Sequence, residues 1–479
     1  MTREIKIHNN LTRKKETFQP IEAGKVKFYS CGPTTYDFLH IGNARAFVVG
    51  DLFNRVLKAF GYDVTFVRNF TDVDDKIIAR AKEVNQDAIK FADHWVTEVK
   101  KDMESLGMRP ATHTPKVSET MPEIIQMIQD IIKNGSGYVV DGEVLFNVPT
   151  MPDYGKLSKK DIDGLQSGIR VEVDAHKKHP TDFVLWKPAK EGEASWDSPW
   201  GKGRPGWHIE CSAMAKKFLG NTLDLHHGGI DLMFPHHENE IAQSEAANKC
   251  GFCNYWAHNE FLNFGTEKMS KSLGNVISIR KFVEAYGGQV LRHVLLSVHY
   301  RARLEWTDEV LQRAMDEVKR IHEFVIETKR YKANGSGPID PEIEKCIEKM
   351  MEELSNDFNS AGALGQYFTF LRYTKNAKDN LSEASLKQIH KTNEFMRETL
   401  GFVNIDPESV MAEFKKQEQN TSNSDVDAAW IEGLIDERKV AKASKNWARA
   451  DEIRKELMAK KIELKDNPDG SSSWKILGL

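Results

Sequence analysis

Four residues with metal-binding side chains are spread over a long stretch of the chain. His236 and Glu240 are four residues apart in a segment that predicts a helix, with Pro235 suited to its first turn, so both side chains share one face. Cys211 lies upstream of this helix, and Cys31 follows a predicted strand near the N-terminus. Two thiolates, an imidazole and a carboxylate make a tetrahedral donor set that suits zinc. From spacing alone a plainer alternative stays open, in which the helical pair lies on the surface and both cysteines are core residues.

Histidine is enriched around this helix. Six of the 16 histidines fall within residues 201–260. The same region holds H-I-E at 208–210 followed by C-G-F-C at 250–253, which imitates a zinc deaminase signature, but Lys249 stands where that signature has proline. A lone C-x-x-C does not complete a structural zinc site either. We therefore interpret Cys250 and Cys253 as two buried cysteines near a loop.

Two further motifs suit a polyphosphate ligand. His40-Ile41-Gly42-Asn43 comes directly after a predicted strand and turn and opens a helix, where glycine permits close approach of a flat base and helix-terminal N–H groups favour phosphate. Lys268-Met269-Ser270-Lys271-Ser272 has two lysines among small hydroxylated residues, which suits a loop that closes on polyphosphate. The plainer alternative for the second motif is a solvated basic turn. Their occurrence together, in this order, favours phosphate binding.

The elements that must position these residues begin with a β-α-β unit. A strand at 25–30, a helix at 42–59 and a strand at 64–67 predict the start of a parallel sheet. A mixed region at 115–200, with a helix near 122–133 and a strand near 139–148, is typical of an insertion. Alternating helices and short strands then resume and predict a second half of the same sheet.

The C-terminal part of the chain is predicted to be mostly helical. Thr307 is a plausible N-cap, and helical periodicity continues to about Gly401 with a break at 334–338. The polar stretch 415–424 predicts a flexible linker. The remaining residues predict a separable module of two helices and a turn-rich end.

Composition excludes several classes of protein. The chain has 479 residues, 40% hydrophobic and 29% charged, which is an ordinary globular balance. We expect no secretory signal, because residues 1–20 are basic but lack an apolar core. We expect no membrane span, because no apolar run reaches the roughly 20 residues that a bilayer requires. Five cysteines are too few for a disulfide scaffold, so we expect a reducing, cytoplasmic location. The net charge of −4 is segregated, since residues 266–332 carry an excess of positive charge and residues 334–426 an excess of negative charge.

Taken together, the motifs resemble the cysteinyl-tRNA synthetases of bacterial type, a family of class I aminoacyl-tRNA synthetases, over nearly the whole chain. The matching segments are C-G-P-T-T-Y-D at 31–37 with the following H-I-G-N, N-F-T-D-V-D-D-K at 69–76, R-P-G-W-H-I-E-C at 204–211, F-P-H-H-E-N-E at 234–240, K-M-S-K-S at 268–272, N-D-F-N at 356–359 and W-A-R-A-D-E-I-R at 447–454. Jointly these segments favour the zinc set over the plainer alternative.

The resemblance implies an α/β fold: a Rossmann-type parallel-sheet catalytic domain with an insertion, then an α-helical bundle and a small C-terminal α+β module. We expect residues 1–114 as the first half of the catalytic domain, 115–200 as the insertion, 201–265 as the second half with zinc ligands, 266–306 as the KMSKS loop and stem-contact region, 307–414 as a tRNA-binding helical bundle, 415–426 as a linker and 427–479 as an anticodon-recognition module.

The resemblance also implies roles for individual residues. It implies one Zn²⁺ ion per subunit, which selects the cysteine thiolate and is held by Cys31, Cys211, His236 and Glu240. It implies a cysteine pocket formed by Gly32, Thr71, Trp207, His226 and Asp231. ATP, with Mg²⁺, is expected at His40, Gly42, Asn43, Lys268 and Lys271, of which all but Gly42 are expected to be catalytic. Anticodon contact is implied for Trp447, Asp451 and Asp466, and a core position is the alternative for Trp447.

The reaction implied is ATP-dependent ligation of L-cysteine to tRNA(Cys) through cysteinyl-adenylate, by a cytoplasmic protein that we expect to be a monomer. No side chain need act as a nucleophile, because positioning and electrostatic stabilisation suffice. Rival hypotheses are a related ligase that delivers cysteine to an amino sugar, a catalytically inactive RNA-binding relative, and a zinc hydrolase, for which no H-E-x-x-H is present.

Three positions depart from the pattern of the family. Asn43 stands where the strict nucleotide motif has histidine, and we expect a weaker phosphate contact there. His227 replaces the first glycine of an H-G-G-G-x-D stretch, which raises the question of the backbone shape beside the amino-acid pocket. Lys442 stands where the C-terminal module often has arginine, and it lacks the planar fork for bidentate contacts.

Overall fold

The computed structural model describes residues 2–160, 176–264, 267–268, 277–402, 406–422, 428–444, 446–459, 462–466 and 472–476. The chain divides into two compact units, Met1–Glu408 and Ser409–Leu479. Within the described residues, no helix combines the length and apolar character that crossing a membrane requires.

A four-stranded parallel sheet forms the centre of the first unit. Its strands, in the order β10-β9-β3-β4, are Cys253–Asn259, Leu223–Gly229, Lys25–Ser30 and Asp63–Val67. Every neighbouring pair runs parallel. The two halves of this sheet come from segments on either side of the expected insertion, which confirms the split parallel sheet predicted from the sequence.

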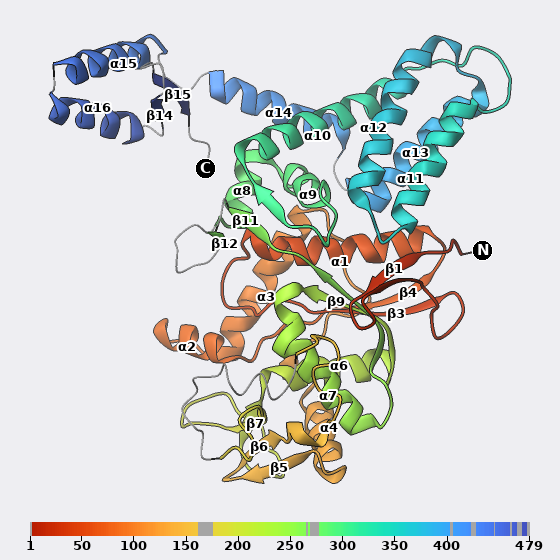
Figure 1. Ribbon diagram of the computed structural model, residues 1–479, viewed down its shortest axis with the longest axis vertical. Coiled ribbons are helices and arrows are strands. Elements are labelled where there is room, and N and C mark those ends of the chain that lie inside the picture. Colours follow the sequence, from red (N-terminus) through yellow and green to blue (C-terminus); the bar gives the residue numbers. More distant parts are fainter. Residues whose placement is uncertain are drawn as a thin grey trace. The chain divides into compact units, whose positions relative to one another are not determined.

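Helices cover both faces of this sheet. Figure 1 shows α1 (Ile41–Ala59) on one side and α6 (Trp207–Leu219) with α7 (Glu238–Asn248) on the other. Helix α1 is almost wholly buried. Because parallel strands are connected by crossover helices, their carboxyl ends meet at one edge, where ligands bind.

The insertion is an antiparallel sheet with one long helix. Helix α4 (Met121–Lys133) precedes strands β5 (Gly137–Val140), β6 (Glu143–Phe146), β7 (Phe183–Pro188) and β8 (Gly203–Pro205). The single strand predicted near 139–148 is wrong, because the chain reverses at Asp141 and Gly142, both of which have positive φ. Aspartate and glycine tolerate this backbone region, so they supply the turn of a hairpin.

Smaller elements complete the first unit around the sheet. They are the hairpin β1 (Lys6–Asn9) and β2 (Lys14–Thr17), the helices α2 (Asp75–Glu83), α3 (Ala88–Ser105), α8 (Ile279–Tyr286) and α9 (Gly288–Leu296), the strands β11 (Leu262–Phe264), β12 (Glu267–Lys268) and β13 (Leu304–Trp306), and the short turns η1 (Val117–Glu119), η2 (Val148–Thr150), η3 (Ile230–Leu232), η4 (Met233–His237) and η6 (Lys378–Asn380).

A helical bundle follows the sheet domain. It comprises α10 (Asp308–Thr328), α11 (Pro341–Ser355), α12 (Ser360–Ala377) and α13 (Glu383–Leu400). The Thr307 hydroxyl accepts a hydrogen bond from the Val310 amide at 3.2 Å, which confirms the predicted N-cap. The predicted end of the helical region near Gly401 is also confirmed, since Gly401 caps α13 in the left-handed conformation.

The second unit contains α14 (Pro407–Ser422, which begins just before the division), α15 (Ala428–Ala443), α16 (Trp447–Ala459) and an antiparallel hairpin of β14 (Ile462–Asp466) and β15 (Ser472–Ile476). The α+β character matches the prediction. The flexible linker predicted at 415–426 is wrong for residues 415–422, which continue α14. Lysine, glutamine and glutamate favour helix, and these eight residues contain neither glycine nor proline.

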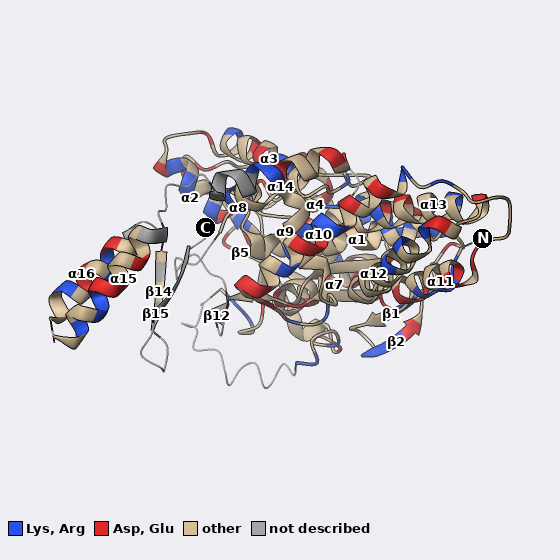
Figure 2. Cartoon of the chain, turned by 90° about the horizontal axis from the view of Figure 1, so that it is seen from above, with Lys and Arg blue, Asp and Glu red and all other residues tan. Residues whose placement is uncertain are grey.

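The positive excess in residues 266–332 is largely neutralised inside the fold. Arg280 pairs with Glu98 and Asp102, Arg292 is fully buried on Asp51, and Arg301 pairs with a buried aspartate of the bundle. Charges of both signs also alternate along α10, α15 and α16 (Figure 2). The net charge of residues 266–332 therefore overestimates how much positive charge this region presents to phosphate groups.

A buried ionic cluster joins the sheet domain to the bundle. The carboxylate of Asp51 on α1 accepts hydrogen bonds from Arg55 at 2.7 Å and Arg292 at 2.6 Å, and all three side chains are buried. Burial alone would raise the pKa of Asp51, but the two guanidinium groups outweigh it and hold the pKa below its ordinary value. Arg55 also donates to the carbonyl of Glu398 in α13.

Replacing Asp51 by alanine is expected to lower the free energy of unfolding by about 3–5 kcal/mol, because two buried guanidinium groups lose their counter-charge. Urea unfolding measures this loss. Asp63→Ala, at an exposed strand end, is the control and is expected to change stability by less than about 0.5 kcal/mol. Because the pKa of Asp51 is depressed in the folded state, its contribution should be complete above about pH 4 and decline at lower pH. Equal losses for both variants would contradict the prediction.

Candidate functional site

A cavity of about 250 Å³ opens at the carboxyl edge of the parallel sheet. It lies where the chain leaves β3, β9 and β10, which is the usual ligand position in an open parallel sheet. Ten of the residues predicted from the sequence line it: Cys31, Gly32, His40, Gly42, Asn43, Thr71, Trp207, Cys211, Asp231 and His236. The tertiary structure therefore brings segments that are more than 200 residues apart in sequence together at one cavity.

Cys31, Cys211, His236 and Glu240, here called the four-residue cluster, meet at the floor of this cavity. One candidate ligand atom from each lies within 4.8 Å of the others, and all four residues are buried. Nε2 of His236 is 3.0 Å from Oε1 of Glu240, and the Cys31 sulfur is 3.6 Å from the same oxygen. Because His236 and Glu240 are both buried, the alternative that they form a pair on the protein surface is wrong. The arrangement can hold a metal ion.

Local structure explains how these side chains converge. Cys31 directly follows β3, Cys211 lies on α6, and Glu240 lies in the first turn of α7. His236 belongs to η4, which runs directly into α7. Phe234 has an extended backbone, so the helical stretch that carries His236 and Glu240 begins at Pro235, as predicted. The predicted common face for His236 and Glu240 is also confirmed by their contact.

The electrostatics of the cluster favour the charged forms of two of its ligands, Glu240 and Cys211. Burial opposes ionisation of Glu240, yet His226 and His236 outweigh it and lower its pKa to about 2. The hydrogen bond from Cys31 is the main reason why the pKa of Cys211 falls to about 6, whereas burial raises the pKa of Cys31. A deprotonated carboxylate and thiolate are the forms that bind metal. The donor set therefore fits a bound cation.

Above the floor, Gly32 and Trp207 shape the cavity. A side chain at Gly32 would place its Cβ 1.7 Å from the carbonyl oxygen of Asn69, so only glycine fits this close approach. Trp207 is 43% exposed, and its ring stacks on His236 with centroids 4.3 Å apart. Thr71 donates to the buried carboxyl group of Glu210 at 3.3 Å. An aromatic ring thus lies directly beside the four-residue cluster.

The N-terminus of α1 also lines the cavity. His40 caps the helix, with Nδ1 accepting from the Asn43 amide at 3.2 Å and the Asn43 side chain accepting from the His40 amide at 3.4 Å. The segment after the K-M-S-K-S motif lies against the start of α1, because the Ile41 amide donates a hydrogen bond to the carbonyl of Ile277 at 3.0 Å. Only the backbone of Lys268 is described, and Lys271 lies outside the described residues.

Comparison with known proteins decides the family. A family model described as the catalytic domain of class I (C) tRNA synthetases matches residues 17–316. A cysteine–tRNA ligase of Halalkalibacterium halodurans is 45% identical over 480 residues, with 98% of this chain and 99% of the relative covered. A cysteine–tRNA ligase of Geobacter sulfurreducens is 43% identical over 484 residues with the same coverage. The chain belongs to the cysteine–tRNA ligase family.

Solved structures support the fold assignment of this family member. LeuRS of Agrobacterium radiobacter K84, in a ternary complex with tRNA, matches with a TM-score of 0.59 at 12% identity, over 82% of this chain and 86% of that chain. Methionyl-tRNA synthetase of Mycobacterium tuberculosis matches with a TM-score of 0.58 at 15% identity, over 81% and 92%. At such identities the likeness concerns the fold alone, and it confirms the class I architecture predicted from the sequence.

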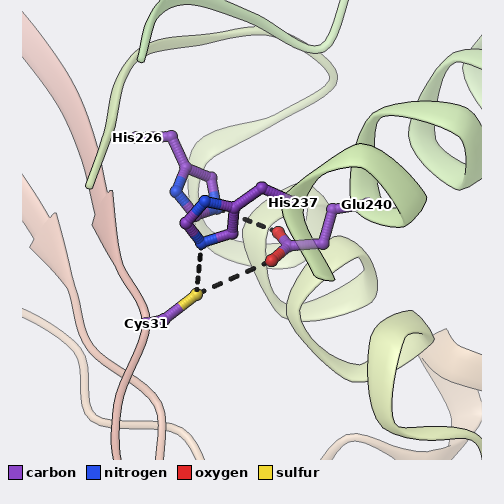
Figure 3. A group of neighbouring side chains, drawn as sticks. All are labelled: Cys31, His226, His237 and Glu240. Atoms are coloured by element: carbon purple, nitrogen blue, oxygen red, sulfur yellow. Dashed lines mark hydrogen bonds and ion pairs between the residues drawn. The ribbon is translucent and has the colours of Figure 1, made fainter. Parts of the chain in front are cut away.

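A second group of buried ligands adjoins the floor of the cavity in this ligase-family chain. His226 and His237 surround Cys31 and Glu240, which belong to both groups (Figure 3). Nε2 of His226 is 2.9 Å from Oε2 of Glu240, and Nε2 of His237 is 3.4 Å from the Cys31 sulfur. Nδ1 of His237 contacts Nε2 of His258 at 2.8 Å. Through these contacts, His226 orients Glu240 and His237 orients Cys31.

His226 therefore has a different place from the one expected. It was expected to contact the amino acid, but it is fully buried behind the cavity wall and contacts Glu240. His237 and His258 were not predicted at all. The enrichment of histidine in residues 201–260 was the available signal, and spacing could not show which of these histidines meet.

Replacing His226 by alanine is expected to weaken metal binding about 10- to 100-fold, because Glu240 loses a hydrogen-bonding partner that orients its carboxylate. Competition with a chelator of known affinity measures the change. The control is His322→Ala, which removes an equally buried histidine from α10, and it should leave metal affinity unaltered. A metal affinity that is the same in both variants would contradict this role.

The departure at His227 leaves the strand regular. Strand β9 keeps its parallel register with β10 through His226, His227 and Gly228. The His227 ring is fully buried, with Nδ1 3.1 Å from the hydroxyl of Ser30. The backbone of β9 is therefore regular at His227, because the histidine is accommodated by a polar contact with Ser30.

The remaining predictions concern residues of the C-terminal unit and the C-x-x-C pair. Trp447 is 60% exposed at the start of α16, so the alternative of a core position is wrong, and Asp451 in the same helix is also exposed. Asp466 ends β14, and its side chain lies outside the described residues. Lys442 is half-buried in α15. Of the C-x-x-C pair, Cys253 is buried as expected, but Cys250 is exposed.

Proposed function

We propose that the chain ligates L-cysteine to tRNA(Cys) with ATP, through cysteinyl-adenylate. The observation that carries this proposal is that one cavity is lined both by residues of the buried four-residue cluster and by the N-terminus of α1. The first region suits a thiol, and the second suits a phosphate. The family membership adds the substrates that the names of the relatives state.

We assign one zinc ion to the four-residue cluster. Cys31, Cys211, His236 and Glu240 supply two sulfurs, a nitrogen and an oxygen, which is a donor set that zinc accepts. When bound, zinc supplies a Lewis acid that prefers a thiolate to a neutral hydroxyl group. A site that requires a specific ligand rejects an isostere lacking it by about 10⁴–10⁵. The cysteine backbone would then lie among Gly32, Thr71, Trp207 and Asp231.

On the nucleotide side, we assign phosphate contacts to His40, Gly42 and Asn43. The substrate carboxylate attacks the α-phosphorus, and pyrophosphate leaves. A hydroxyl group of the terminal ribose of the tRNA then attacks the acyl carbon, the bond between the acyl carbon and the phosphate oxygen breaks, and AMP leaves. Lys268 and Lys271, with Mg²⁺ that accompanies ATP, offset the charge that develops on the phosphates. The chain's residues thus act by orientation and electrostatics.

The C-terminal unit is proposed to recognise the anticodon. The exposed ring of Trp447 offers a stacking face for a base, and Asp451 and Asp466 offer hydrogen-bond acceptors. We place the reaction in the cytoplasm, in keeping with five free cysteines. We also keep the expectation of a monomer, which light scattering tests.

The decisive experiment is cysteine-dependent exchange between ATP and labelled pyrophosphate, with serine as the control. Exchange with cysteine and none with serine supports the proposed activity and the selectivity of the metal. Absence of exchange with cysteine would overturn the activity. Equal exchange with both amino acids would overturn the zinc assignment while leaving adenylate formation in place.

A further inference from the structure

Arg45 is a fully buried cation that the proposed chemistry does not use. It lies on α1 just after the His40–Asn43 motif, and its side chain is 0% exposed. Its guanidinium group donates only to main-chain carbonyls among the hydrogen bonds of the described residues: those of Phe261, His299, Tyr300 and Ala302. One side chain therefore holds two segments that are distant in sequence from α1.

The first of these segments is a wall of the cavity. Residues 259–262 line the cavity, and they connect β10 to the strand that leads into the K-M-S-K-S motif. The second segment, 299–302, lies behind this wall. The Glu260 amide donates to the carbonyl of Tyr300 at 2.8 Å, and the Leu304 amide donates to the carbonyl of Phe261 at 3.1 Å. Backbone hydrogen bonds therefore join the wall to the segment behind it.

The charge on Arg45 persists despite burial. Burial lowers the pKa of Arg45 to about 10, so the guanidinium group is still protonated at neutral pH. Carbonyl dipoles solvate this charge, and the planar fork of the guanidinium group fixes the directions of several acceptors at once. A lysine in this position has one compact ammonium group and cannot hold both segments in the same geometry.

The backing segment has a second anchor in the bundle. Asp357, from the N-D-F-N motif that the resemblance singled out, accepts from the Tyr300 hydroxyl and from Nε of Arg301, both at 2.7 Å. Phe358 stacks on Phe53 of α1 with ring centroids 4.0 Å apart. Asp357 therefore anchors segment 299–302 to the helical bundle, and Arg45 anchors the same segment to α1.

We propose that Arg45 is a positioning residue for ATP, which sets the distance between the cavity wall at 259–262 and the N-terminus of α1. The inference rests on the proposed function and adds a residue to its nucleotide side. The cysteine side is held independently, because Cys31, Cys211 and Trp207 come from β3 and α6. Loosening Arg45 should therefore affect ATP and spare the amino acid.

The test compares Arg45→Lys and Arg45→Gln with Arg55→Lys. Arg55 is a matched control because it lies on the same helix, is equally buried and also donates to carbonyls, but those belong to Gly107 and Glu398, away from the cavity. Pyrophosphate exchange gives KM for ATP and for cysteine separately. Calorimetric titration with ATP alone gives the same comparison without any amino acid, and thermal unfolding reports the folding of each variant.

Both Arg45 variants are expected to raise KM for ATP and the ATP dissociation constant about tenfold, with KM for cysteine within about twofold and metal content unchanged. Arg55→Lys should lower the melting temperature while KM for ATP stays near the wild-type value. Wild-type ATP binding in both Arg45 variants, or an equal rise in both KM values, would overturn the inference. Loss of cysteine-dependent exchange in the wild-type protein would overturn the proposed function instead, and the titration with ATP alone would still decide the role of Arg45.

Discussion

Replacing Cys211 by serine is expected to remove the bound metal and, with it, the preference for cysteine over serine. Cys211 supplies one of the two sulfur ligands of the four-residue cluster and is buried beside Cys31. A hydroxyl group stays protonated where the thiol ionises, so the cluster loses both a soft ligand and a negative charge. Selectivity of about 10⁴ should fall below about 10², because hydrophobic contacts alone distinguish such isosteres poorly.

The measurements are the zinc content of the purified protein and the rates of pyrophosphate exchange with cysteine and with serine. Cys346→Ser is the matched control, since Cys346 is a similarly buried thiol in α11 of the bundle. It should retain about one zinc ion per chain and the full preference for cysteine. If Cys211→Ser also retained its zinc and its selectivity, the metal assignment would be wrong.

Deleting residues 427–479 is expected to leave the activation of cysteine by ATP intact and to impair the charging of tRNA. The deleted segment holds α15, α16 and the β14–β15 hairpin, and it forms its own small core. The cavity and every described residue that lines it belong to the first compact unit. Pyrophosphate exchange should therefore stay within about twofold of wild type, while kcat/KM for tRNA charging should fall about 100-fold or more.

A point substitution sharpens this prediction. Trp447→Ala removes the exposed ring at the start of α16, and loss of a stacked base costs about 1–3 kcal/mol, or roughly 5- to 150-fold in kcat/KM for tRNA. Val440→Ala, at another exposed apolar position of the same unit, is the control and should charge tRNA normally. Loss of exchange and charging together in the deletion variant would contradict a separable recognition module.

The two sides of the cavity have different structural supports. The four-residue cluster is held by β3, α6 and α7 and by the buried histidines that contact Cys31 and Glu240. The wall at 259–262 is held by Arg45 and, through segment 299–302, by Asp357 of the bundle. The bundle therefore contributes to the geometry of this wall, although it is remote in sequence from the residues of the cavity.

Local features of the sequence predicted the elements well. The strand at 25–30, the helix that ends at Ala59 and the N-cap at Thr307 all follow from hydrophobic spacing and from short-range hydrogen bonds within a few residues. Donor chemistry predicted which residue types suit a metal and a phosphate. The choice of Cys31 and Cys211 as partners of His236 and Glu240 needed the resemblance to a family as well.

Tertiary structure decided what spacing could not. The hairpin at 137–146 and the helical continuation through 415–422 depend on turn geometry and propensity that a hydrophobic pattern represents poorly. The place of His226 behind Glu240, and the contacts of Arg45 with carbonyls more than 200 residues away, depend on how the elements pack. Apart from these two segments, the sequence alone determined the main elements and the chemical types of the ligands, because both are local properties. Only the packed fold determined which side chains meet, because buried polar groups find their partners through contacts between distant segments.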